Sequence, residues 1–263
     1  MQKYTRELAY VLYSKPCAER GLFLEVLTQQ GRLGLFLKNH VQKKSKIHAL
    51  QAFMPVYIDA AGQGDLQTIT QIEWAQDRAF ELKLISPLQG KALISALYIN
   101  ELLCYFLKRE EALPEIFDSY EKVLHALNQS KNSEKIDLIL RIFECQLLDV
   151  LGFNFLEYPE FQKLEPEAWY KIDLNRHCYI KLPLLGNGPG NVPDNLLGQG
   201  AIQGKVFWAL KNTFALALEQ LDYLENSPLL QPEIRKQAKF LLRMIVQFYL
   251  GNRVIKTRAY YSA

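Results

Sequence analysis

The sequence has few cysteines and no long apolar run, and each shortage excludes a class of protein. No two of the four cysteines lie close enough in sequence to form a C-x-x-C metal knuckle or a local disulfide framework. We therefore expect reduced thiols. No stretch approaches the roughly 20 apolar residues of a membrane-spanning helix, and Met1–Glu7 lacks the apolar core of a signal peptide. These features predict a cytoplasmic protein.

The chain also has little net charge. Its 263 residues include 31 Lys and Arg against 28 Asp and Glu, a formal charge of +3. That excess alone does not require a nucleic acid or an anionic membrane as partner. With 49% hydrophobic and 22% charged residues, the composition is that of a globular protein and excludes a disordered, collagenous or coiled-coil chain.

The charge is unevenly distributed, because two segments contain no acidic residue. The segment between Glu25 and Asp59 carries a charge of +5, and the segment after Glu233 carries +7. One basic run often serves only as a solvated surface, whereas two runs in one chain favour contact with phosphates. We predict DNA contact for Arg32, Lys38, Lys43, Lys44, Lys46, Arg253, Lys256 and Arg258.

Short apolar runs between Glu7 and Trp74 predict five β-strands. They are about six residues long, rich in aromatic and β-branched residues, and separated by turn residues such as Gly21 and Gln30–Gly31. Five strands in about 75 residues, with one long basic connection after the third, favour a small OB-like barrel over a sandwich. The pattern does not decide whether Tyr10, Tyr13 and Phe36 face a nucleic-acid strand or the core; the core is the default for alternating apolar positions.

Helical periodicity replaces this pattern after Trp74. Ser86–Pro87, Pro114 and Ser133 each have the residues of a helix start, and Gly152 those of a helix stop. Residues 155–204 are rich in proline and glycine and lose the period, and two more helices close the chain. The predicted fold is α+β, with residues 1–80 an OB-like barrel, 81–154 the first part of a helical domain, 155–204 a loop-rich insertion and 205–263 the second helical part with a basic tail.

An ordered series of motifs resembles the bacterial recombination mediator family RecO. The series includes Ala9–Pro16, Thr28–Leu33, Leu50–Pro55, Tyr98–Leu103, Arg141–Leu148 and Leu250–Arg258, and Lys38–Ser45 stands where the family has a lysine-glycine-alanine-arginine loop followed by serine. The resemblance covers nearly the whole chain. It implies a bacterial, nucleoid-associated protein that binds single- and double-stranded DNA, anneals complementary strands and, with RecR, helps load RecA onto DNA coated by the single-strand-binding protein.

The resemblance also bears on partners and metals. The family docks the acidic tail of the single-strand-binding protein on its helical domain, and Arg141 matches a basic position proposed to receive that tail. The alternative for Arg141 is a surface residue in an i, i+3 pair with Glu144. Many members carry a four-cysteine zinc knuckle in the insertion, whereas residues 155–204 offer only His177 and Cys178. This chain resembles the metal-free branch, so we expect no metal and no cofactor.

Two other classes of function compete with the repair mediator. For an enzyme, adjacent Glu110 and Glu111 diverge on a helix, and adjacent His177 and Cys178 rarely meet in hydrogen-bond geometry. Gly186–Gly190 lacks the Lys-Ser or Lys-Thr of a phosphate loop. We therefore predict that the chain is not an enzyme. The remaining alternative is a helical protein-interaction adaptor with only incidental DNA binding.

Overall fold

The computed structural model describes residues 2–17, 21–39, 41, 52–62, 66–84, 87–183, 200–214 and 221–261. The chain divides into two compact units, Met1–Ser130 with Val254–Ala263, and Lys131–Arg253. The first unit is thus discontinuous in sequence, because the chain leaves it after residue 130 and returns at residue 254. Among the described residues, no helix combines the length and hydrophobicity needed to cross a membrane.

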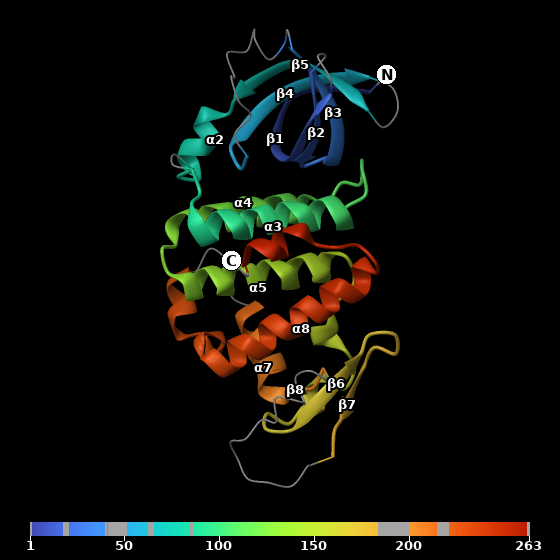
Figure 1. Cartoon of the computed structure of the whole chain (residues 1–263), viewed down its shortest axis with the longest axis vertical. Helices are drawn as coiled ribbons and strands as arrows, with labels where there is room; N and C mark the ends of the chain where they lie inside the picture. The colour runs from blue at the N-terminus through green and yellow to red at the C-terminus, as the bar shows by residue number, and fades with distance from the viewer. Residues whose placement is uncertain are drawn as a thin grey trace. The chain divides into compact units, whose positions relative to one another are not determined.

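Five strands of the first unit form a closed barrel in the order β1-β2-β3-β5-β4 (Figure 1). All neighbours are antiparallel except β3 and β5, which are parallel. The long strand β1 bends at two irregularities, so its first half pairs with β4 and its second half with β2. The expected OB-like barrel is confirmed. Its strands are β1 (Gln2–Cys17), β2 (Gly21–Thr28), β3 (Gly31–Lys38), β4 (Pro55–Gly62) and β5 (Gln67–Trp74).

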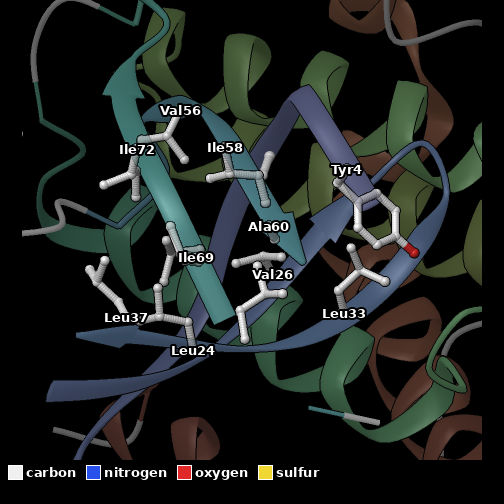
Figure 2. Close-up of a cluster of buried hydrophobic side chains, with 13 residues drawn as sticks. Tyr4, Leu24, Val26, Leu33, Leu37, Val56, Ile58, Ala60, Ile69 and Ile72 are labelled. Carbon is white, nitrogen blue, oxygen red and sulfur yellow. The ribbon is translucent and has the colours of Figure 1, made fainter. Parts of the chain in front are cut away.

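Alternation along each strand fills the barrel interior. Leu33, Leu35 and Leu37 of β3 are almost fully buried there, and Figure 2 shows Leu33 and Leu37 among side chains from the other strands. Because side chains alternate, Arg32, Gly34, Phe36 and Lys38 belong to the outer face of the same strand. Truncating a core leucine such as Leu35 to alanine is expected to cost about 2–5 kcal/mol.

Two helices of the first unit cover part of β1. Tyr10 is fully buried outside the barrel interior, where its ring contacts Tyr120 and its hydroxyl donates to Glu121 Oε1 over 2.7 Å. Tyr120 in turn donates to Asn100 Oδ1 (2.8 Å), and Asn100 Nδ2 donates to the carbonyl of Leu12 (3.1 Å). These bonds satisfy buried polar groups and fix the helices to the strand. The two helices are α3 (Gly90–Phe106) and α4 (Pro114–Gln129), and a shorter helix, α2 (Gln76–Glu81), precedes them.

The predicted helix boundaries hold in part. Pro114 opens α4, and Gly152, with φ of 79°, follows the end of the next helix as expected. The start predicted at Ser86–Pro87 is wrong, since α3 begins at Gly90 after an extended Gln89. Leu88 is buried just before that cap, which fixes the direction of chain entry.

The cap predicted at Ser133 is also wrong. Asn132 caps the helix, because its Oδ1 accepts from the backbone N–H groups of Glu134 (2.7 Å) and Lys135 (3.4 Å). Asparagine is among the strongest N-cap residues, so it takes the role one position earlier than the serine.

The second unit combines packed helices with a small sheet. The helices α5 (Ser133–Val150), α7 (Gly204–Phe214) and α8 (Pro232–Leu250) contact one another. Part of the predicted loop-rich insertion is instead a three-stranded sheet of order β7-β6-β8. Its strands are β6 (Trp169–Asp173), β7 (Cys178–Lys181) and β8 (Ile202–Gln203).

The sequence pattern did not predict this sheet, because its strands are short and several prolines lie around them. Its hairpin turn uses Asp173 Oδ1, which accepts from the N–H groups of Asn175 (3.1 Å) and Arg176 (3.0 Å). Tyr170 is buried on the unit's core. The described residues also include 3₁₀ turns at Phe155–Glu157, Phe161–Lys163, Leu221–Asn226, Pro228–Leu230 and Lys256–Tyr261.

Candidate nucleic-acid interface

One outer face of the barrel combines aromatic and basic side chains. Strand register places Lys15 opposite Phe23 and Phe23 opposite Phe36, so the three side chains form one row across β1, β2 and β3. Tyr13 and Lys38, two positions along β1 and β3, and Arg109, near the Phe23 ring, flank this row. We call it the basic–aromatic face, and define it by Tyr13, Lys15, Phe23, Phe36, Lys38 and Arg109.

The aromatic residues on this face point away from the barrel interior. Tyr13 is 51% exposed, and Phe23 and Phe36 are partly exposed. The expectation that these aromatic residues face the core is therefore wrong for Tyr13 and Phe36, and it holds for Tyr10. The register of β1 shifts between Val11 and Tyr13, which places Tyr13 outside, and Phe36 alternates with Leu35 and Leu37, which fill the interior.

Arg109 reaches this face from the loop between α3 and α4. Its Nη2 bonds to Glu25 Oε1, and its guanidinium carbon lies 5.6 Å from the Phe23 ring centroid. A side chain at Gly34 would block this position, since a Cβ there would lie 2.7 Å from Arg109 Cζ. Gly34 therefore allows the guanidinium to lie against β3, where it remains partly exposed.

Arg32, a predicted DNA contact, is held mainly by the protein itself. Its Nη1 lies 2.8 Å from Glu25 Oε2, and its Nε donates to the carbonyl of Leu107 over 3.0 Å. Its backbone carbonyl also accepts from Glu110 N–H at 2.9 Å. These contacts tie the α3–α4 loop to β3 and keep Arg109 on the face. The charge count over the acid-free segment between Glu25 and Asp59 did not indicate this pairing, because Glu25 lies just outside that segment.

The other predicted cations of this window have different positions. Lys38 is exposed at the end of β3, opposite Gly21 of β2. Lys43, Lys44 and Lys46 lie outside the described residues. Their part in DNA contact therefore stays a prediction from the sequence.

The C-terminal basic segment is divided between the two compact units. Arg253 is exposed at the end of the second unit, whereas Lys256 and Arg258 belong to the first unit. Lys256 is exposed and Arg258 partly buried. Other cations of this run have local partners: Arg235, for example, pairs with Glu134 at 2.8 Å. A sum of charges along the sequence therefore overstates this run as one continuous surface.

Arg141 is buried on α5, with 4% of its surface exposed. Its Nη1 lies 3.1 Å from Glu144 Oε2, so the expected i, i+3 pair exists, although it is not on the surface as that alternative assumed. The pair meets the distance of an ion pair but not the alignment of a hydrogen bond. Arg141 Nε also lacks a hydrogen-bond acceptor among the described residues.

A second outer face of the barrel is acidic. We call it the β4–β5 face, and define it by Thr5, Arg6, Tyr57, Asp59, Gln71 and Glu73, which line a shallow pocket of about 240 Å³. Asp59 Oδ1 accepts from the backbone N–H of Arg6 at 2.6 Å and so holds Arg6 at φ of 48°. The Arg6 guanidinium lies 4.5 Å from the centre of the Tyr57 ring. One side of that ring is thus already covered by an arginine of the same chain.

The groups considered for enzymatic chemistry show no assembled site. Glu110 binds Gln67 Nε2 at 3.5 Å, and the His177 ring stacks on Tyr158 with 5.2 Å between centroids. Burial raises the pKa of Cys104 to about 11 and also raises that of Cys145, so neither thiol is activated. In the described ranges, no three His, Cys, Asp or Glu residues gather as metal ligands. Gly186–Gly190 lies outside those ranges.

Comparisons with known proteins cover both parts of the fold. Residues 1–78 match the family model Recombination protein O N terminal, and residues 87–156 match Recombination protein O C terminal. The DNA repair protein RecO of Dechloromonas aromatica is 30% identical over 260 residues, which cover 97% of this chain and 94% of that protein. The DNA repair protein RecO of Nitrosococcus oceani is 31% identical, with 95% of this chain and 89% of that protein covered. By sequence and by barrel, this chain belongs to the RecO family of DNA repair proteins.

Proposed function

We propose that the chain binds single- and double-stranded DNA through its barrel and anneals complementary strands during repair. The observation that carries the proposal is the basic–aromatic face, where Lys15, Lys38 and Arg109 accompany Tyr13, Phe23 and Phe36. Cations neutralise phosphates without reading sequence, and exposed aromatic rings stack on unpaired bases. The face has both kinds of group on one rigid sheet.

Annealing follows from the same chemistry. Two single strands repel each other through their phosphates, and a protein that neutralises both removes part of that repulsion. The family further suggests RecR, RecA and the tail of the single-strand-binding protein as partners, in the bacterial cytoplasm at the nucleoid. In this role, the protein changes which strands meet and needs no catalytic group, metal or cofactor.

The direct test is single-stranded DNA binding by a variant with Lys38, Lys43, Lys44 and Lys46 changed to alanine. Binding is measured by fluorescence anisotropy across a salt series. Each phosphate contact raises the affinity for single-stranded DNA about fourfold at 0.15 M salt relative to about 1 M salt, because log K falls with log salt concentration by about 0.7 per contact. The variant should bind more weakly and show a shallower salt dependence. A matched variant with alanine at four other exposed lysines, Lys83, Lys131, Lys163 and Lys181, should keep the parental slope.

Equal losses in both four-lysine variants would show that only net charge matters. Unchanged binding by the first variant would remove the barrel connection from the interface. The first result would leave the helical adaptor with incidental DNA binding as the better description, whereas the second would confine the interface to the rest of the basic–aromatic face.

We also propose that Arg141 receives the acidic tail of the single-strand-binding protein. Support comes from its Nε donor, which has no acceptor among the described residues, since a buried guanidinium with a spare N–H can donate to a carboxylate. Glu144 competes for that guanidinium, so Glu144→Gln should strengthen tail-peptide binding and Arg141→Gln should weaken it, with DNA binding unchanged. Peptide affinities that do not respond to either change, in variants that melt like the parent, would exclude Arg141 from the site.

A further inference from the structure

The C-terminal segment returns to the first unit and is held there by one carboxylate. Glu101 lies on α3, partly exposed, and accepts three hydrogen bonds from the segment. Its Oε1 accepts from Lys256 N–H at 2.7 Å, while its Oε2 accepts from Thr257 N–H at 2.9 Å and from the Thr257 hydroxyl at 2.7 Å. We call residues Val254–Tyr261 the C-terminal strap.

Two further contacts fix the strap to the same helix. Tyr105, one turn after Glu101, donates its hydroxyl to the Val254 carbonyl at 3.1 Å. Ile255 is buried between these anchors, although its neighbours Val254 and Lys256 are exposed. The strap is thus attached at a few polar points around one apolar side chain.

The carboxylate acts on the strap as a helix cap from another part of the chain. A helix leaves its first N–H groups without partners, and a negative charge there is favourable. The 3₁₀ turn Lys256–Tyr261 begins at the two residues whose N–H groups reach Glu101. Loss of the carboxylate would leave these donors without their acceptor and loosen the turn.

The helix that holds the strap also leads into the basic–aromatic face. After α3 ends at Phe106, Leu107 accepts from Arg32 and Arg109 pairs with Glu25. The C-terminal half of α3 therefore holds the strap, and the loop that follows this helix carries Arg109. We propose that Glu101 is a positioning residue that fixes the exposed Lys256 on the barrel-containing unit as a second cationic contact for DNA phosphates. The Arg258 guanidinium, whose Nε and Nη2 are buried, adds positive charge two residues later. The proposal rests on the DNA binding proposed above.

The positioning role and a simple effect of net charge predict opposite changes in DNA affinity when Glu101 is removed. Removing an exposed acid from a DNA-binding protein should raise its affinity for DNA. If Glu101 positions the strap, Glu101→Ala should instead weaken single-stranded DNA binding by roughly four- to fifteenfold at 0.15 M salt, the equivalent of one to two phosphate contacts. Glu115→Ala, which removes an exposed acid from α4, is the matched control and should leave affinity equal or slightly higher.

A second readout follows the strap without DNA. Trypsin cleaves after Lys256 and Arg258, so loss of docking should speed cleavage at these bonds several-fold in Glu101→Ala, and less in Thr257→Val, which removes one of three bonds. Thr257→Val carries the test if Glu101→Ala fails to fold. In a Lys256→Ala/Arg258→Ala background, Glu101→Ala should cause no further loss of DNA affinity.

The outcomes separate this inference from the proposed function. A parent protein that does not bind DNA, with strap cleavage still dependent on Glu101, would overturn the proposed function and the positioning role together but keep the docking. A parent that binds DNA, with Glu101→Ala behaving like Glu115→Ala in both assays, would overturn this inference alone. Additive losses in the triple variant would also overturn it, because the cations would then act without Glu101.

Discussion

The two outer faces of the barrel carry similar residue types but use them differently. On the basic–aromatic face, the acid Glu25 is buried between Arg32 and Arg109, while Lys15, Lys38 and Tyr13 are exposed. On the β4–β5 face, Arg6 is placed over the Tyr57 ring, and Asp59 and Glu73 line the surface. The first face hides its acid and presents its cations, whereas the second presents acids beside an exposed arginine that already lies against its aromatic ring.

The difference shows that neighbours decide what an aromatic–arginine pair offers a ligand. The Tyr57 hydroxyl donates to Asp77 at 2.9 Å, and that bond lowers the pKa of Asp77. Negative charge is therefore kept beside the ring, which disfavours an approaching phosphate. Arg109 instead shares a buried carboxylate with Arg32, and the cluster keeps an excess of positive charge.

The largest expected effect comes from reversing charge on the basic–aromatic face. Lys15→Glu with Lys38→Glu should weaken single-stranded DNA binding about a hundredfold at 0.15 M salt, since two phosphate contacts are lost and two repulsive charges appear. Lys83→Glu with Lys131→Glu has the same net charge and should have a much smaller effect. Anisotropy titrations of both variants decide the point. Equal losses would mean that overall charge, rather than this face, controls binding.

A smaller effect is expected from removing one exposed ring. Tyr13→Ala should weaken binding to oligothymidine roughly tenfold, because stacking on one base contributes about 1–3 kcal/mol. The salt slope should not change, since no cation is lost, and Tyr13→Phe should restore affinity. Tyr57→Ala on the β4–β5 face is the counterpart and should bind like the parent. A similar loss in both alanine variants would show that the two faces do not differ as binding surfaces.

These comparisons also show how far the sequence could lead. The barrel was predictable because its signal is local: runs such as Leu33–Lys38 alternate between interior and surface and end at turn residues. The outward position of Phe36 could be predicted from the same alternation, once Leu35 and Leu37 are assigned to the interior. The outward position of Tyr13 was not, because it depends on an irregularity in β1.

The candidate site was predictable only in part, because its charges are paired across the fold. Arg109 and Glu25 are 84 positions apart, and nothing in either local pattern indicates their contact. The same pairing explains why Arg32 is a poor candidate for a free phosphate contact although it lies in an acid-free window. Counting charge along the chain finds basic segments, but burial and partners decide which cations reach a ligand.

The smallest expected effect concerns Glu7, a partly buried acid of β1, and is measured as a change in stability. Burial raises the pKa of Glu7 above its ordinary value of 4.5. The native state therefore binds this proton more tightly than the unfolded state, so the contribution of protonated Glu7 is complete below about pH 4.5 and is lost as pH rises through the native pKa. Glu7→Gln, which stays neutral, should raise the free energy of unfolding at pH 7, and its advantage should shrink as pH falls through the native pKa of Glu7 and be lost below about pH 4.5. Urea unfolding from pH 4 to pH 7 measures this difference. An advantage that grew on acidification would mean that Glu7 gains more from charged partners than burial costs it.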